Sequence, residues 1–116
     1  SVHPLRALMV LGHPGKLTKL AMGQWDTHSA RSSSAVGFLG RLCEEVLQGR
    51  AADSPTTEGI FAALPPTERT ALGDELARRV RNRIEERIRG RFDVSVFLSD
   101  MAGDRLGSDG EFELWQ

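Results

Sequence analysis

The chain has 116 residues, a length typical of one domain, with 40% hydrophobic and 27% charged residues. This composition is that of a globular protein, and it excludes wholesale disorder and collagen-like chains. The formal net charge of -1 predicts no attraction to nucleic acid or anionic lipid. The single cysteine, Cys43, excludes an internal disulfide and favours a reducing, cytoplasmic location. No apolar run reaches the roughly 18 residues of a membrane span, so we expect no membrane partner.

The chain begins with a pattern typical of a strand followed by a short helix. Residues 7–11 form a continuous apolar run that ends at Gly12, which favours a strand buried on both faces. Apolar residues at helical spacing then predict a helix over 16–22 that ends at Gly23.

Three more helices are predicted by apolar spacing between the polar segment 24–33 and residue 89. Their expected ranges are about 34–47, 55–64 and 68–89, and their expected N-caps are Ser33 or Ser34, Ser54 and Thr67.

The last part of the chain is typical of a sheet. Residues 92–98 alternate between apolar and other side chains, 100–110 has the glycine and aspartate content of a turn, and 112–114 predicts a last short strand. A strand, a helical crossover and a returning strand are expected to be parallel, with an antiparallel hairpin added at the end. The predicted fold class is therefore a small α/β protein with a mixed sheet and about four helices.

The turn after the first strand, Gly12-His13-Pro14-Gly15-Lys16, is the most distinctive local feature. Backbone N–H groups at a helix start attract anions, and glycine lets a ligand approach the backbone. Lys16 and Lys19 are the only lysines, and both lie beside this turn. The phosphate-loop pattern GxxxxGK[ST] is not met, because Val10 and Leu17 stand at two of its positions. Anion binding and an ordinary strand–helix turn both remain open.

The polar segment holds the densest cluster of functional side chains, Asp26-Thr27-His28-Ser29. Asp26, His28 and Ser29 are the residue types of a hydrolase triad, but they are too close in sequence to align, and no G-x-S-x-G motif is present. The spacing of His13, Asp26 and His28 matches no zinc pattern, so no metal is expected. The same residue types cap helices and turns, which is the structural alternative.

Seven arginines lie between residues 78 and 91, which raises the possibility of a nucleic-acid surface. Acidic residues at i,i+4 spacing favour a solvated helix face instead, so no nucleic acid is expected. The expected pairs are Asp74–Arg78, Glu75–Arg79, Arg81–Glu85 and Glu85–Arg89.

The run 10–29 resembles the C-terminal part of the cobalt-precorrin-5B C(1)-methyltransferases, the CbiD-type enzymes of anaerobic cobalamin (vitamin B12) biosynthesis. That family has a GHxGKLxKLAxG run after a strand and then, after a short spacer, THS. The matching residues here are Gly12, His13, Gly15, Lys16, Leu17, Lys19, Leu20, Ala21, Gly23, Thr27, His28 and Ser29. The resemblance implies that residues 1–116 are a single domain, a C-terminal fragment of a longer enzyme.

The resemblance also implies methyl transfer from S-adenosylmethionine to C1 of a cobalt-containing corrin precursor that carries many carboxylates. It implies His28 as the catalytic residue, acting as proton acceptor, as hydrogen-bond partner of the substrate or as an axial contact to its cobalt. The implied substrate-binding residues are Gly12, His13, Gly15, Lys16, Lys19, Asp26, Thr27 and Ser29. No GxGxG-type donor-binding turn is present, so the donor site is expected outside this chain or only partly in it.

One departure from the family follows Ser29, where the family continues with an Asp and a Glu that are absent here. If those carboxylates touch substrate, the activity is weakened or altered, and the alternative is a non-catalytic anion- or tetrapyrrole-binding module with the family's fold. In either case we expect the turn 12–16 and the loop 27–29 to face one shared anion-accepting pocket at the carboxyl edge of the sheet.

Overall fold

A computed structural model describes residues 7–23, 32–49, 54–88 and 93–110 of the chain. The elements follow the predicted order of a strand, helices, a returning strand and a hairpin. They are β1 (Ala7–Gly12), α1 (Pro14–Ala21), α2 (Ser32–Val46), α3 (Thr57–Ala62), α4 (Pro66–Ile88), β2 (Asp93–Ser99) and β3 (Arg105–Asp109).

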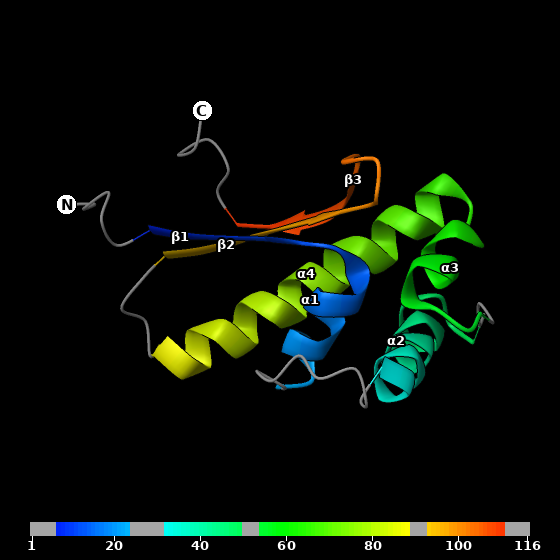
Figure 1. The fold of residues 1–116 in the computed structure, drawn as a ribbon, viewed down its shortest axis with the longest axis horizontal. Helices are drawn as coiled ribbons and strands as arrows, with labels where there is room; N and C mark the ends of the chain where they lie inside the picture. The colour runs from blue at the N-terminus through cyan, green and yellow to red at the C-terminus, as the bar shows by residue number, and fades with distance from the viewer. Residues whose placement is uncertain (1–6, 24–31, 50–53, 89–92, 111–116) are drawn as a thin grey trace.

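The three strands form one mixed sheet in the order β1-β2-β3 (Figure 1). β1 and β2 are parallel, with Ala7 opposite Asp93 and Gly12 opposite Leu98, so both strands end at the same edge. β2 and β3 are antiparallel. The predicted α/β fold, with a parallel crossover and an antiparallel hairpin, is confirmed.

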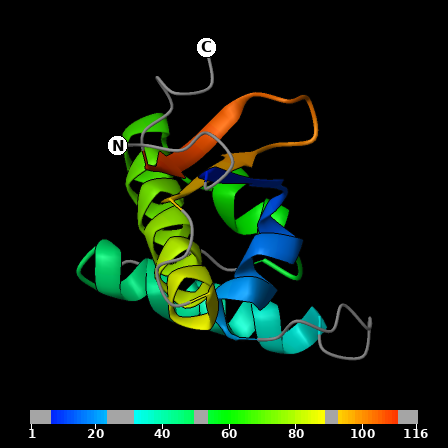
Figure 2. The same ribbon diagram turned by 90° about the vertical axis from the view of Figure 1, so that its left-hand side faces the viewer.

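Helix α4 is the centre of the packing. It lies across β2 and β3 and also contacts α1, α2 and α3, while α1 lies along the same side of the sheet (Figures 1 and 2). Apolar residues recur every four positions along α4 and therefore face the sheet as one stripe. The core joins this stripe to β2 and to the other helices; among its fully buried members are Leu17, Leu39, Cys43, Ile60, Leu72, Leu76, Val80, Val94, Val96 and Leu98.

The expected helix starts need correction at all four helices. Helix α1 begins at Pro14 rather than at residue 16, and α2 begins at Ser32, so the expected caps Ser33 and Ser34 lie inside the helix. The N-cap of α3 is Thr56, whose Oγ1 accepts a hydrogen bond from the Gly59 N–H at 3.0 Å, and Ser54 instead bonds the Thr56 N–H. Helix α4 begins at Pro66, before the expected cap Thr67, because the fixed φ and missing N–H of proline suit a first helical position.

The hairpin also differs from expectation, because the turn predicted over 100–110 contains a strand. The side chain of Asp100 closes a much shorter turn, since its Oδ1 accepts from the N–H groups of Ala102 and Asp104, both at 2.9 Å. β3 can therefore begin at Arg105. The predicted strand at 112–114 lies outside the described residues.

Within the described ranges, no helix has both the length and the apolar character needed to cross a membrane.

Candidate functional site

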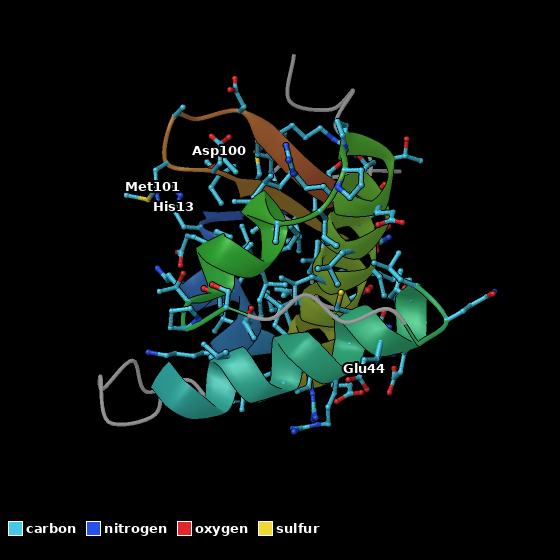
Figure 3. All side chains as sticks on the ribbon, turned by 90° about the vertical axis from the view of Figure 1, so that its right-hand side faces the viewer. His13, Glu44, Asp100 and Met101 are labelled. Carbon is cyan, nitrogen blue, oxygen red and sulfur yellow. The ribbon has the colours of Figure 1, made fainter. Side chains whose placement is uncertain are left out.

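The turn from β1 into α1 lies at the carboxyl edge of the parallel strand pair. His13 is the extended N-cap residue of α1, and Pro14 takes its first position. The Nδ1 atom of His13 lies 3.2 Å from the backbone oxygen of Ser99, at the end of β2. A carbonyl oxygen only accepts, so Nδ1 carries a proton and, in the neutral ring, Nε2 is left as an acceptor. The exposed imidazole is thus oriented by the sheet (Figure 3).

Both motif glycines of this turn are in close contact with other parts of the chain. A Cβ on Gly12 would lie 2.9 Å from Cδ2 of Leu17, so a side chain there would push α1 away from the strand. A Cβ on Gly15 would lie 3.4 Å from Oγ1 of Thr57 and 3.8 Å from Oε2 of Glu58, at the start of α3. Packing within the chain therefore accounts for Gly12, whereas a Cβ on Gly15 would make only ordinary van der Waals contacts, and close approach of a ligand to either glycine stays a prediction.

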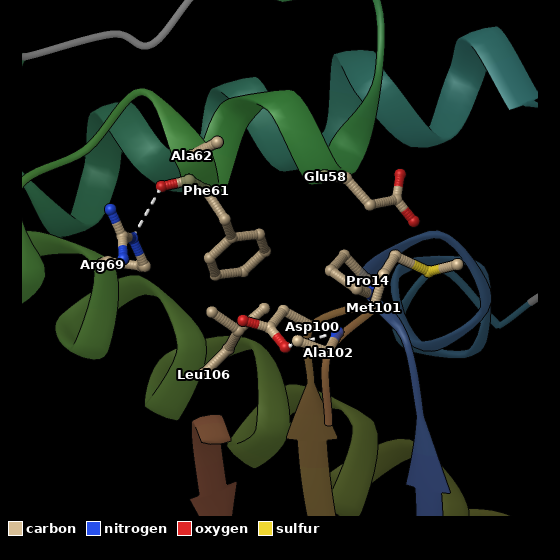
Figure 4. A pocket seen from close by; sticks show the side chains of 9 residues that line it. All are labelled: Pro14, Glu58, Phe61, Ala62, Arg69, Asp100, Met101, Ala102 and Leu106. Carbon is tan, nitrogen blue, oxygen red and sulfur yellow. Dashed lines mark hydrogen bonds between the residues drawn. The ribbon is translucent and has the colours of Figure 1, made fainter. Parts of the chain in front are cut away.

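A cavity of about 360 Å³ opens between this turn, α3 and the β2–β3 turn (Figure 4). The Phe61 ring projects from α3 toward its centre, and Met101 lies at its rim with 75% of its surface exposed. The described residues that line it are Pro14, Glu58, Phe61, Ala62, Arg69, Asp100, Met101, Ala102 and Leu106.

The charges around this cavity are mainly negative. Glu58 and Asp100 each contribute a carboxylate. Arg69 is the one cation among the described residues of the lining. Its guanidinium is held by the end of α3: Nε donates to the Phe61 carbonyl at 3.0 Å and Nη2 to the Leu64 carbonyl at 2.8 Å. The cavity therefore has an apolar floor and an acidic rim.

The lysines lie on α1 beyond this cavity. Lys19 is half-buried and lines a smaller cavity of about 190 Å³, together with Gly15 and the start of α3. Lys16 is exposed. Glu58 lines both cavities, and its Oε1 accepts from the Thr57 hydroxyl at 2.9 Å. A carboxylate thus separates the acidic cavity from the one beside Lys19.

Of the predicted site residues, the structure brings together those of the first turn and helix: Gly12, His13, Gly15, Lys16 and Lys19. The other predicted residues, Asp26, Thr27, His28 and Ser29, lie outside the described residues, so the shared pocket with 27–29 stays a prediction. Among the residues that are described, no three His, Cys, Asp or Glu side chains are grouped to hold a metal ion.

Sequence reasoning missed Glu58, Phe61, Asp100 and Met101. A usable signal existed for Asp100, because an aspartate directly after a parallel strand lies at the edge where α/β proteins bind ligands. No comparable signal marks Phe61, since its apolar spacing in a helix is equally that of a core residue.

A family model described as "CbiD, C-terminal domain" matches residues 26–110. A protein of Syntrophotalea carbinolica named cobalt-precorrin-5B C(1)-methyltransferase is 47% identical over 113 residues, which are 97% of this chain and 32% of that relative. Relatives of the same name from Ralstonia nicotianae and Methanococcus maripaludis strain C6 are each 34% identical, over 94% and 89% of this chain and 30% of their own lengths. The chain thus spans about a third of their length. No solved structure matches it.

Proposed function

The chain belongs to the CbiD family, and from this premise we propose that it forms the C-terminal part of a cobalt-precorrin-5B C(1)-methyltransferase of cobalamin biosynthesis. The single observation that carries the proposal is the 47% identity to a protein of that name over 97% of the chain. The donor is proposed to be S-adenosylmethionine, and the acceptor a cobalt-corrinoid with many carboxylate groups.

The lysines of α1 are proposed to bind carboxylates of the corrinoid. Lys16 is exposed and Lys19 half-buried, and neither has an ion pair within the described residues. Both follow the start of α1, where the backbone N–H groups also favour negative charge. The Nε2 of His13, for which no hydrogen bond is found within the described residues, is proposed to accept a hydrogen bond from the same substrate. The remaining proposed substrate contacts are Gly12, Gly15, Asp26, Thr27 and Ser29.

His28 is proposed as the catalytic residue. When bound, the donor supplies an electrophilic methyl group on a good leaving group, so the task of the protein is mainly to align donor and acceptor. The imidazole of His28 would take a proton, donate a hydrogen bond to the corrinoid or contact its cobalt.

The larger cavity fits part of a sulfonium donor better than it fits the corrinoid. Its acidic rim, Glu58 and Asp100, repels carboxylates and attracts a cation, while Phe61 and Leu106 offer an apolar floor for an aromatic base. A volume of about 360 Å³ is at the small end for such ligands. We therefore propose that Glu58 and Asp100 face the donor and that the rest of its site lies outside this chain.

The proposed function is tested by a chimera in which this chain replaces the matching C-terminal third of the Syntrophotalea carbinolica relative. Transfer of a labelled methyl group from S-adenosylmethionine to cobalt-precorrin is the readout. We expect the chimera to be active and this chain alone to be inactive. A folded chimera that binds the corrinoid without transferring the methyl group would favour the non-catalytic binding module.

In that chimera, Lys16→Ala and Lys19→Ala are expected to raise KM for the corrinoid about 10- to 100-fold each, since hydrogen bonds to charged groups contribute roughly 1.5–3 kcal/mol. His28→Ala should instead lower kcat. Arg41→Ala is the matched control, because it removes an exposed cation from α2, away from both cavities. An equal rise in KM for Arg41→Ala and Lys16→Ala would contradict a specific role of the lysines in binding the corrinoid.

If the larger cavity binds the donor, it should prefer a ligand with a positive charge. Calorimetry on the chimera measures this preference. S-adenosylmethionine should bind about tenfold more tightly than S-adenosylhomocysteine, which lacks the sulfonium charge, and Asp100→Asn should reduce this ratio. Asparagine keeps an oxygen that can accept the hydrogen bonds from the Ala102 and Asp104 N–H groups. A reduced affinity ratio in Asp100→Asn therefore reports the loss of the negative charge. Glu44→Gln, an exposed acid of α2 distant from the cavity (Figure 3), should leave the ratio unchanged.

A further inference from the structure

The face of the sheet turned away from α1 and α4 carries apolar side chains, and we name it the outer face. Side chains alternate along a strand, so Met9 and Leu11 project opposite to Val10, which packs against the core. The register places Met9 beside Ser95 and Leu11 beside Phe97. Leu11 is 60% exposed, one of two large hydrophobic residues exposed to this degree in the described ranges. The outer face is thus apolar at β1, where it is most open.

β1 also has an edge that pairs with no strand among the described elements. The strand order is β1-β2-β3, so the second edge of β1 pairs with none of the described strands, and we call it the free edge. Proteins that leave a strand edge in solvent usually protect it with charges, proline or a bulge. Ala7–Gly12 contains neither a charge nor a proline, and its pairing with β2 is regular. A parallel strand that is apolar on both faces is normally covered on both faces.

We propose that the outer face, together with the free edge of β1, is the docking surface for the part of the CbiD-family polypeptide that this chain does not span. The chain matches 32% of the Syntrophotalea carbinolica relative, so about two thirds of that relative lies outside the match. An apolar, uncharged surface of this kind is typical of an interface inside one protein.

The position of the surface connects it to the candidate site. Leu11 lies two residues before His13, whose imidazole is held at the carboxyl edge of the sheet. A polypeptide that covers Leu11 reaches this same edge. The covering part can therefore contribute groups beside the larger cavity, where this chain alone supplies only part of a donor site. The docking surface rests on family membership and on packing, not on the methyl transfer itself.

The test compares this chain alone with the chimera described above. Hydrogen exchange of the β1 amides should slow at least tenfold in the chimera, because the free edge becomes paired or buried. Leu11→Glu should lower the melting temperature of the chimera by roughly 10 °C or more and that of the isolated chain by under about 3 °C, since Leu11 is 60% exposed there. Leu11→Thr, a milder change, should give a smaller loss with the same contrast.

Ala71→Glu is the matched control, because Ala71 is an exposed apolar residue of α4 that lines neither of the two cavities and does not lie on the outer face; it should have a small effect in both proteins. Equal small effects of Leu11→Glu in both proteins, or unchanged exchange of β1, would overturn the docking surface. A dimer of the isolated chain that Leu11→Glu dissociates, without protection in the chimera, would assign the surface to a second copy instead. An inactive chimera with a protected β1 would contradict only the proposed function.

Discussion

Some residues of the candidate site are explained by packing within the chain, and others are not. Gly12 is needed by the packing of α1, since Leu17 occupies the space of its missing side chain, whereas a Cβ on Gly15 would lie at ordinary contact distance from the start of α3. Lys16 and Lys19 have no such reason, because neither has an ion pair in the described part of the chain. The functional proposal therefore depends more on the lysines and on His13 than on the glycines.

The carboxylate of Glu75 provides a prediction on pH dependence. Its pKa is lowered from the ordinary value of 4.5, mainly by the hydrogen bond from Arg78 and further by Arg79, although burial partly opposes the shift. A lowered folded-state pKa stabilises the protein above the unfolded pKa, and this stabilisation is lost as the pH falls through the folded value. Glu75→Gln should thus cost about 0.5–1 kcal/mol of unfolding free energy at pH 7, and the difference from wild type should vanish well below pH 4.5.

Urea unfolding at pH 7, 5 and 3 measures this difference. Glu44→Gln is the control, since Glu44 is exposed and has no ion pair within the described residues. A cost of Glu75→Gln that stays constant down to pH 3 would show that the lost contribution is not electrostatic.

At the scale of elements, the contact between α4 and β3 is made by two glycines. A Cβ on Gly107 would lie 2.0 Å from the carbonyl carbon of Gly73, and a Cβ on Gly73 would lie 2.0 Å from the Leu106 oxygen. The obstructing atoms are backbone, which cannot rotate away. A side chain on either glycine must therefore separate the helix from the strand.

Gly107→Ala should accordingly destabilise the protein by about 2–3 kcal/mol, the range for overpacking a core. Gly40→Ala is the matched control, because Gly40 lies inside α2 and a Cβ added there would meet no heavy atom within 4 Å. It should stabilise by about 0.5–1 kcal/mol, since alanine forms helix better than glycine. Thermal unfolding followed by circular dichroism compares the stability of the two variants. Equal changes in stability would contradict the close contact between Gly107 and Gly73.

At the scale of the whole molecule, the arginine-rich helix is neutralised by acids from several elements. Arg79 pairs with Glu75 of its own helix and with Glu45 of α2, and Arg81 lies 3.6 Å from Asp109 of β3. One predicted pair was wrong: Asp74 of α4 pairs with Arg105 of β3 and accepts a hydrogen bond from the Ser108 N–H, while Arg78 pairs with Glu75. The predicted pair Glu85–Arg89 lies partly outside the described residues. Ion pairs of α4 thus connect this helix to α2 and β3.

We therefore expect no nucleic-acid binding by this helix. Filter binding to duplex DNA at low salt should give no micromolar affinity. The triple variant Glu45→Gln, Glu75→Gln and Glu85→Gln releases arginines from their acids and should bind more tightly, with a steeper salt dependence. Micromolar binding by the unchanged chain would contradict the prediction.

The sequence alone determined the order of the elements, the mixed sheet and the apolar stripe of α4, because these follow from local periodicity and chain order. It also indicated the family, because the motif residues between Gly12 and Ser29 keep the family's residue types and spacing. Only the tertiary structure decided that Glu58 and Asp100 meet beside Pro14, that Gly73 faces Gly107, and that the outer face of β1 stays open. These depend on contacts between residues distant in sequence, which no local pattern encodes.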